Sequence, residues 1–328
     1  MRPPVLVYRG EALGAYGYAD KPWFLPDVRL AAFLRAAEDR GLAARVRWIE
    51  APPAADADLH RFHPPAHVAM IRRRCAAEDG ALDHGATPAR ASVERAATHV
   101  AGAVIDAAAR ILAGEARRAF VPIAGFHHAH RERVRSYCLF NDPAIALAYL
   151  RDRGVAPRLY VDTDVHFGDG VYEGFADDPD LWLVDIHEQT GTLWPYSPAV
   201  PGVGPQPGDR HERGRGLGRG AKLNLPLAAG AGDAEFAAAW AEAEALCERS
   251  EPAFIVATLG IDALDGDPMA HLRLSPEALA EVTRRLCALA ERHAGGRLLV
   301  LGGGGYRLES IERGWGGILE AMVDAPGS

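Results

Sequence analysis

The stretch LYVDTDVHFGDG, residues 159–170, decides which fold the sequence can adopt. It begins as a short run of apolar and aromatic residues and passes directly into a polar segment that contains two glycines. An apolar run of this length is typical of a strand buried on both faces of a parallel sheet, and ligands bind beyond the carboxyl ends of such strands. We therefore expect residues 162–170 to lie at the ligand-binding edge of an α/β sheet.

Similar apolar runs recur along the whole chain. Seven more have strand length: Val5–Tyr8, Val46–Ile49, Ala119–Ile123, Leu181–Ile186, Lys222–Leu225, Phe254–Leu259 and Leu298–Leu301. Four segments have helical spacing of apolar residues: Ala91–Ala113, Pro143–Arg153, Ala234–Arg249 and Pro276–His293. This alternation predicts an α/β fold, an open sheet of about eight mainly parallel strands with helices on both faces.

No internal repeat or linker divides the sequence, so we expect a single catalytic domain over residues 1–328. The segment Pro198–Gly220 is long for a loop, and we interpret it either as a functional rim or as a tolerated surface insertion.

The 36 basic and 44 acidic residues give a net charge of −8, which argues against a general nucleic-acid-binding protein. No apolar stretch approaches the roughly 18 residues of a membrane span, and no signal peptide is recognisable, so we expect a cytoplasmic protein with reduced cysteines.

Polar residues follow five of the predicted strands. They are His127 and His128, the segment 162–170, His187, Asp262, and the run Gly302–Gly305 with Tyr306. Because the carboxyl ends of parallel strands share one edge of a sheet, we expect these groups to lie together.

Asp164 and His166 are two residues apart, so their side chains can point to the same side of an extended segment. Asp262 is the natural third ligand of a metal ion. Three protein ligands with an open fourth position describe a catalytic metal site, and oxygen and nitrogen donors suit zinc, iron(II) or cobalt(II). The alternative interpretation of the DxDxH string is a solvated loop with carboxylate caps.

The adjacent histidines His127 and His128 each need a polar partner, and Asp162 and Asp169 are available carboxylates. An aspartate that accepts from Nδ1–H fixes the tautomer of a histidine and raises its basicity, which would make a general base. The alternative is a pair of surface histidines in a polar turn.

The glycines before Tyr306 allow close backbone approach, and the phenol of Tyr306 could donate a hydrogen bond to a developing oxyanion. A phosphate-binding loop is rejected because its lysine and Ser/Thr are absent.

Together these motifs resemble the histone deacetylase family, with its acetylpolyamine amidohydrolase and acetoin-utilisation relatives, within the arginase–deacetylase fold. The matching segments occur in family order: DLHRFHPPAHV (58–68), TPA (87–89), GFHHA (125–129), YCLFND (137–142), DTDVHFGDG (162–170), LGIDALDGDP (259–268) and LGGGGY (301–306). The resemblance implies Asp164, His166 and Asp262 as zinc ligands and Tyr306 as the phenol that polarises the substrate carbonyl. The bridging carboxylates of the two-metal arginase branch are replaced by Gly168 and Gly260, so we expect one catalytic metal.

The resemblance also assigns roles to the histidines and to a second cation. It implies that His128, paired with Asp169, is the general base and acid, and that His127, paired with Asp162, is an electrostatic partner. It further implies a structural potassium ion whose ligands are Asp162, Asp164, His166, Asp185 and Ile186. Asp185 stands where many relatives have serine, so a carboxylate would replace that hydroxyl ligand.

The residues expected to contact the substrate are Tyr137 and Trp194, as aromatic walls of an acyl-lysine tunnel, together with Met269 and Gly304. Three positions depart from the family pattern. Phe167 replaces the second histidine of the usual HHGDG string, and Ala86 replaces an aspartate that grips the substrate backbone in many protein-acting members. Met269 replaces a carboxylate found in some polyamine-selective relatives.

The function implied by the resemblance is zinc-dependent removal of an acetyl group from acetyl-lysine or from a small acetylated amine. One alternative is an acetylpolyamine amidohydrolase. Another alternative, from a different class, is an acyl-lysine-binding pseudoenzyme. Loss of a metal ligand, of one of the paired histidines or of Tyr306 would favour a pseudoenzyme, and the sequence retains all of these residues. We expect no nucleic-acid or membrane partner, and a homo-oligomer stays open.

Overall fold

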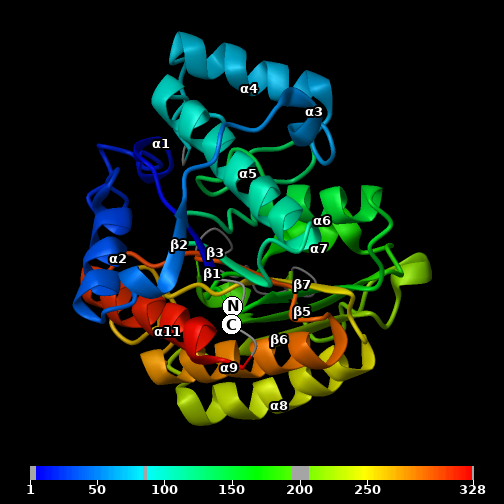
Figure 1. Ribbon diagram of the computed structural model, residues 1–328. Helices are drawn as coiled ribbons and strands as arrows, with labels where there is room; N and C mark the ends of the chain where they lie inside the picture. The colour runs from blue at the N-terminus through cyan, green and yellow to red at the C-terminus, as the bar shows by residue number, and fades with distance from the viewer. Residues whose placement is uncertain (1–4, 84–86, 194–206, 327–328) are drawn as a thin grey trace.

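The computed structural model describes residues 5–83, 87–193 and 207–326, and within them eight parallel strands form one sheet (Figure 1). The order across the sheet is β2-β1-β3-β8-β7-β4-β5-β6. The strands are β1 (Val5–Tyr8), β2 (Val46–Ile49), β3 (Arg118–Val121), β4 (Arg158–Asp162), β5 (Leu181–Glu188), β6 (Lys222–Leu227), β7 (Phe254–Thr258) and β8 (Leu298–Leu301). The predicted open parallel sheet is confirmed, and the strand ends differ from the predicted ones by two residues at most.

Helices cover both faces of this sheet, as predicted. Figure 1 shows α5 (Ala91–Leu112), α6 (Asp142–Asp152) and α7 (Asp169–Phe175) on one side. The other side carries α8 (Asp233–Arg249), α9 (Pro276–His293) and α11 (Gly316–Asp324). Parallel strands need this double cover because their apolar side chains point to both faces.

Several helices were not predicted. The longer ones are α2 (Val28–Asp39), α4 (Pro65–Ala77) and α11, and the shorter ones are α1 (Glu11–Gly14), α3 (Asp56–Leu59), α7 and α10 (Leu308–Ser310). A π-helical turn spans Ile311–Trp315, and 3₁₀ turns span Ala43–Arg45, Thr190–Thr192 and Gly216–Gly218. The apolar pattern of α4 is interrupted by three consecutive arginines, which conceals its buried face in the sequence. Among the described residues, no helix is long and apolar enough to cross a membrane.

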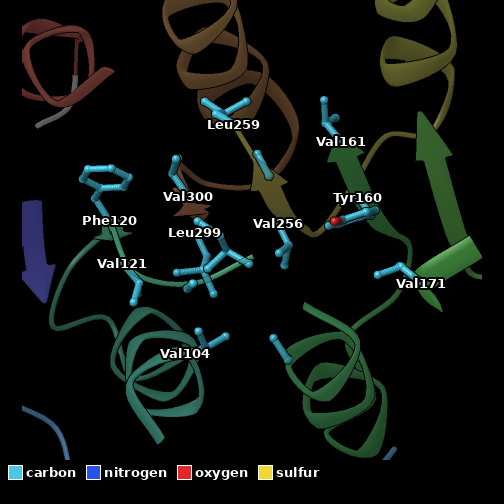
Figure 2. Close-up of a cluster of buried hydrophobic side chains, with 14 of the residues drawn as sticks. Val104, Phe120, Val121, Tyr160, Val161, Val171, Val256, Leu259, Leu299 and Val300 are labelled. Carbon is cyan, nitrogen blue, oxygen red and sulfur yellow. The ribbon is translucent and has the colours of Figure 1, made fainter. Parts of the chain in front are cut away.

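The core lies between the sheet and its helices. In Figure 2, Val121 of β3 points toward Val104 of α5, while its neighbour Phe120 points to the opposite face. Leu299 and Val300 of β8 alternate in the same way, and all five side chains are fully buried. These uninterrupted apolar runs therefore fill two packed layers, one on each side of the sheet.

The sheet order also determines where polar groups gather. The five strands followed by polar residues are β3, β8, β7, β4 and β5, and they are consecutive neighbours in the sheet. Their carboxyl ends therefore lie side by side at one edge, although the segments are far apart in the sequence.

Candidate active site

Asp164 and His166 follow β4, and Asp262 follows the neighbouring strand β7. The ligating atoms of these three residues lie within 4.8 Å of one another. The Nδ1 atom of His166 is 3.1 Å from Oδ1 of Asp164 and 3.2 Å from Oδ2 of Asp262. Both carboxylates are buried, and the His166 side chain is only 11% exposed. The structure thus brings together the three residues expected to bind the metal.

The chemistry of this cluster fits a divalent cation. Within the described chain, Oδ2 of Asp262 is buried and accepts no well-aligned hydrogen bond, although Nδ1 of His166 lies 3.2 Å away. Burial and the nearby charge of Asp164 raise the pKa of Asp262 to about 7. Burying two ionised carboxylates next to each other raises the free energy of the folded protein unless a positive charge compensates them. Two carboxylate oxygens and one imidazole nitrogen are a donor set that zinc accepts.

Two glycines allow the backbone to approach this cluster. A Cβ atom at Gly304 would lie 2.0 Å from Oδ2 of Asp262, and one at Gly260 would lie 2.5 Å from Oδ2 of Asp164. The Gly304 amide donates to Oδ2 of Asp164 at 2.6 Å. Any side chain at these positions would displace the carboxylates, so the glycines are steric requirements of the cluster.

The two adjacent histidines each donate from Nδ1 to a buried carboxylate. His127 pairs with Oδ2 of Asp162 and His128 with Oδ1 of Asp169, both at 2.8 Å. Burial lowers the pKa of His127, but Asp162 and Asp164 outweigh this effect and raise it to about 10. Burial and the charged His127 together lower the pKa of His128 to about 4. The surroundings therefore favour the charged form of His127 and the neutral form of His128.

The cluster and the histidines line a cavity of about 40 Å³. The predicted site residues at this cavity are His127, His128, Tyr137, Asp164, His166, Asp262, Met269, Gly304 and Tyr306. Burial and Asp262 raise the pKa of the Tyr306 phenol well above its ordinary value, so this group stays protonated and can donate. The Tyr306 amide donates to Oδ2 of Asp267 at 2.9 Å, which fixes the residue beside the cavity.

The wall residue Tyr137 is held in an unusual backbone conformation. Ser136 and Tyr137 have positive φ angles of 51° and 65°. The Ser136 amide donates to Oδ2 of Asp83 at 3.1 Å, and the Tyr137 amide donates to Oγ1 of Thr87 at 2.9 Å. Left-handed conformations of such residues persist only where the surroundings hold them, and these two bonds do so.

Three of the residues expected at a potassium ion, Asp162, Asp185 and Ile186, lie on the neighbouring strands β4 and β5. Asp162 and Asp185 are paired in the register of these strands, and Ile186 follows on β5. Oδ2 of Asp185 accepts from the Gly168 amide at 2.9 Å, and its Oδ1 lies 2.6 Å from Nδ1 of His187. The carboxylate that replaces the family serine is therefore hydrogen-bonded by the protein itself.

Three features named in the sequence analysis lie wholly or partly outside the described residues, and a fourth, Phe167, lies away from the cavity. Trp194 and Ala86 lie outside the described residues, as does the part of the 198–220 segment that precedes residue 207. Phe167 is 2% exposed and packs against the His187 ring at a centroid distance of 5.0 Å, so it does not line the cavity.

Several residues at the site were not singled out from the sequence. Arg29 of α2 lines the cavity and donates to the Gly303 carbonyl at 2.7 Å. Asp142 accepts from the amides of Gly125 and Phe126 at 2.8 and 2.9 Å, which fixes the loop before the histidines. The signal for Arg29 is an arginine among the buried apolar positions of a helix. The signal for Asp142 is its place in the segment YCLFND.

Comparison with known protein families agrees with this geometry. A model of the histone deacetylase domain matches residues 25–322. The acetoin utilization protein AcuC of Bacillus subtilis is 32% identical over 284 residues, which cover 84% of this chain and 71% of that protein. A histone deacetylase-like amidohydrolase of Pseudomonas aeruginosa is 34% identical over 270 residues, which cover 81% of this chain and 68% of that protein.

Two further comparisons extend the match. The human polyamine deacetylase HDAC10 is 31% identical over 294 residues, which cover 86% of this chain and 42% of that protein. The crystal structure of the HDA15 HD domain superposes with a TM-score of 0.87 at 24% identity, covering 99% of this chain and 90% of that one, and supports the same fold. The chain therefore belongs to the histone deacetylase family, whose members are hydrolases that act on amides.

Proposed function

We propose that this protein, as one catalytic domain over residues 1–328, is a zinc-dependent deacetylase that acts on acetyl-lysine or on a small acetylated amine. The observation that carries the proposal is the convergence of the cluster Asp164, His166 and Asp262 with two His–Asp pairs around one small cavity. A cation held by this cluster would polarise the amide carbonyl and lower the pKa of a water molecule. Iron(II) and cobalt(II) suit the same donors.

His128 supplies the proton transfers of this reaction. Its Nδ1 donates to Asp169, so Nε2 is the ring nitrogen that can accept a proton. His128 is neutral at pH 7, which allows it to take a proton from water and return it to the leaving amine. The positive charge of His127, whose Nε2 lies 3.3 Å from that of His128, would favour negative charge developing nearby.

Tyr306 stabilises the substrate oxygen as it gains charge. Its phenol remains protonated because burial and Asp262 raise its pKa. The ring packs edge-on against Phe24 at a centroid distance of 5.6 Å, and Asp267 holds its amide. A donor held before the reaction is effective because it needs no reorganisation as the oxyanion forms.

The shape and charge of the protein favour a slender, basic substrate. The cavity of about 40 Å³ has room for a short acyl group, and the Tyr137 wall suits an aliphatic stem. The net charge of −8 attracts cationic partners at long range. Acetylpolyamines are the second candidate substrate because the human relative is a polyamine deacetylase. Met269, which lacks a carboxylate at the cavity, favours acetyl-lysine over acetylpolyamines.

A turnover screen of the zinc-loaded protein tests this proposal. Acetyl-lysine peptides, acetylpolyamines and longer acyl-lysines are compared by kcat/KM, and we expect acetyl-lysine to lead. An acetylpolyamine preferred by at least about tenfold, equivalent to roughly 1.4 kcal/mol, would reverse the order of the two candidates. Binding of acyl-lysine by zinc-loaded protein without turnover of any substrate would identify a pseudoenzyme instead.

A further inference from the structure

The carboxylate of Asp169 has two sides, and only one faces His128. Its Oδ1 accepts from Nδ1 of His128, whereas its Oδ2 faces a group of charged side chains. Nε2 of His130 lies 3.2 Å from this oxygen, and Nε of Arg135 lies 3.1 Å from it. Asp169 and His130 are 3% and 8% exposed, so these contacts are shielded from solvent.

The segment that carries these cations has little freedom to move. The His130 amide donates to the Arg133 carbonyl at 2.9 Å, and the Cys138 amide donates to the Arg135 carbonyl at 2.8 Å. Two successive turns therefore present His130 and Arg135 to α7, the helix that supplies Asp169 and Glu173.

The protonation state of His130 decides which neighbours it binds. Its Nδ1 lies 3.0 Å from Glu173, while its Nε2 lies 2.8 Å from the Arg133 guanidinium as well as 3.2 Å from Asp169. A neutral ring can donate from Nδ1 to Glu173 and accept at Nε2 from Arg133. A protonated ring donates to Asp169 and Glu173 at once, and the Arg133 guanidinium, 2.8 Å from Nε2, must then move away because Nε2 can no longer accept from it.

The charges around the ring favour the protonated state. Burial lowers the pKa of His130, but the hydrogen bonds to Asp169 and Glu173 outweigh it and raise the pKa above its ordinary value. The guanidinium groups of Arg133 and Arg135, from the same segment, carry like charges close to the ring and oppose its protonation. Protonated His130 and Arg135 then hold Oδ2 from two directions.

We propose that His130 is a positioning residue for His128: in its protonated form it holds Asp169 in the orientation that accepts from Nδ1 of His128. The inference rests on the proposed role of His128 in amide hydrolysis. When His130 loses its proton, Nε2 accepts from Arg133, which lies 2.8 Å away, and Asp169 loses the hydrogen bond that His130 donated. Turnover then falls on the alkaline side of the pKa of His130, while substrate binding at the cavity is unaffected.

Three variants of the zinc-loaded enzyme test this proposal through the pH profile of kcat. His130→Gln removes the charge, and we expect kcat roughly tenfold or more lower, KM nearly unchanged and the alkaline limb lost. His130→Lys keeps the charge, and the alkaline limb should move up by more than about one pH unit. Glu173→Gln removes a partner of the protonated ring, so the limb should move down by roughly half a pH unit.

A surface histidine provides the matched control. His211, whose side chain is 94% exposed, lies outside this network, and His211→Gln should leave the pH profile of the parent unchanged. A merely structural role for His130 would lower activity equally at every pH in both His130 variants. The proposal is wrong if His130→Gln and His130→Lys share the pH profile of the parent.

Magnetic resonance of ¹⁵N-histidine-labelled, zinc-loaded protein measures the same contacts without a substrate. Among the 13 histidines, the signal missing in His130→Gln identifies the ring. Its pKa should fall in Glu173→Gln and in Asp169→Asn. If both substitutions lower the pKa of His130 but the protein has no hydrolase activity, the contact between His130 and Asp169 is supported and the proposed function is refuted. A titration that ignores both substitutions would refute the contact itself.

Discussion

His127 and His128 are neighbours in the chain, yet their surroundings give them different chemistry. Each donates from Nδ1 to a buried aspartate at 2.8 Å. His127 faces Asp162 and Asp164, which raise its pKa to about 10 against the effect of burial. His128 lies beside this cation, so burial and His127 both lower its pKa, to about 4. The surroundings therefore favour the charged form at one position and the neutral form at the next.

At this scale we predict that Tyr306→Phe lowers kcat by a factor on the order of 10²–10³ because one oxyanion donor is lost. The zinc content should stay unchanged, since the phenol is not one of the clustered metal ligands. Steady-state kinetics and elemental analysis measure the two quantities. Tyr137→Phe is the control, because it removes a phenol from the cavity wall and retains the ring. Turnover by Tyr306→Phe within a few-fold of the parent would exclude Tyr306 from the mechanism.

We also predict one catalytic divalent ion per chain, lost together with activity in Asp262→Ala. Asp262 supplies one of the two carboxylates of the cluster, and the remaining Asp164 and His166 bind a cation weakly. Metal analysis after dialysis and kinetics of the reloaded variant provide the test. Two catalytic ions per active chain, or full activity after exhaustive chelation, would contradict this prediction.

At the scale of elements, the start of α6 connects helix capping to the catalytic loop. Oδ1 of Asn141 accepts from the Ala144 amide at 2.9 Å, which caps the helix. Its Nδ2 donates to the carbonyls of His127 and Ala129 at 2.9 and 2.8 Å. One buried side chain therefore both begins a helix and fixes the backbone of both histidines.

We predict that Asn141→Asp preserves the cap but lowers kcat, because a carboxylate cannot donate to these two carbonyls. Ser275→Ala, which removes the cap of α9 away from the site, should lower the free energy of unfolding by about 1 kcal/mol and leave kcat unchanged. Denaturant titration and kinetics of both variants separate the two roles. Equal kcat in Asn141→Asp and the parent would show that these donors do not position the histidines.

At the scale of the whole molecule, His63 joins its own segment to two points of the distant connection between β3 and α6. Its Nδ1 donates to the Arg131 carbonyl at 3.0 Å, and its Nε2 accepts from the Asn141 amide at 2.9 Å. The second bond requires an unprotonated Nε2, so the two bonds together fit a neutral ring with its proton on Nδ1. Burial lowers the pKa of His63 from 6.5 to about 3, so the folded protein keeps this ring unprotonated in mild acid.

We predict that this histidine makes the protein less stable in acid. Between pH 6.5 and 3 the unfolded chain binds a proton at His63 that the folded chain does not, so the free energy of unfolding falls as pH falls. The slope approaches about 1.4 kcal/mol per pH unit within this window. Denaturant titrations from pH 7 to pH 4 should show a shallower decline for His63→Gln than for the parent, from a lower starting stability. Parallel declines would assign the acid sensitivity to other groups.

The sequence by itself determined the positions of all eight strands, of the helices α5, α6, α8 and α9, and of the polar residues at the strand ends. These features follow from local patterns, because the apolar content of a run and its neighbouring glycines and aspartates can be read over a few residues. The cluster Asp164, His166 and Asp262 was also predictable, since parallel strands bring their carboxyl ends to one edge.

Only the tertiary structure decided the features that depend on distances between remote groups. It placed Arg29 at the cavity, capped α6 with the residue that fixes the histidine loop, and set His130 between Asp169, Glu173 and Arg133. It also separated the pKa values of His127 and His128, which share the same residue type and adjacent positions. Protonation depends on burial and on charges a few ångströms away, and both are properties of the folded chain rather than of any short stretch of sequence.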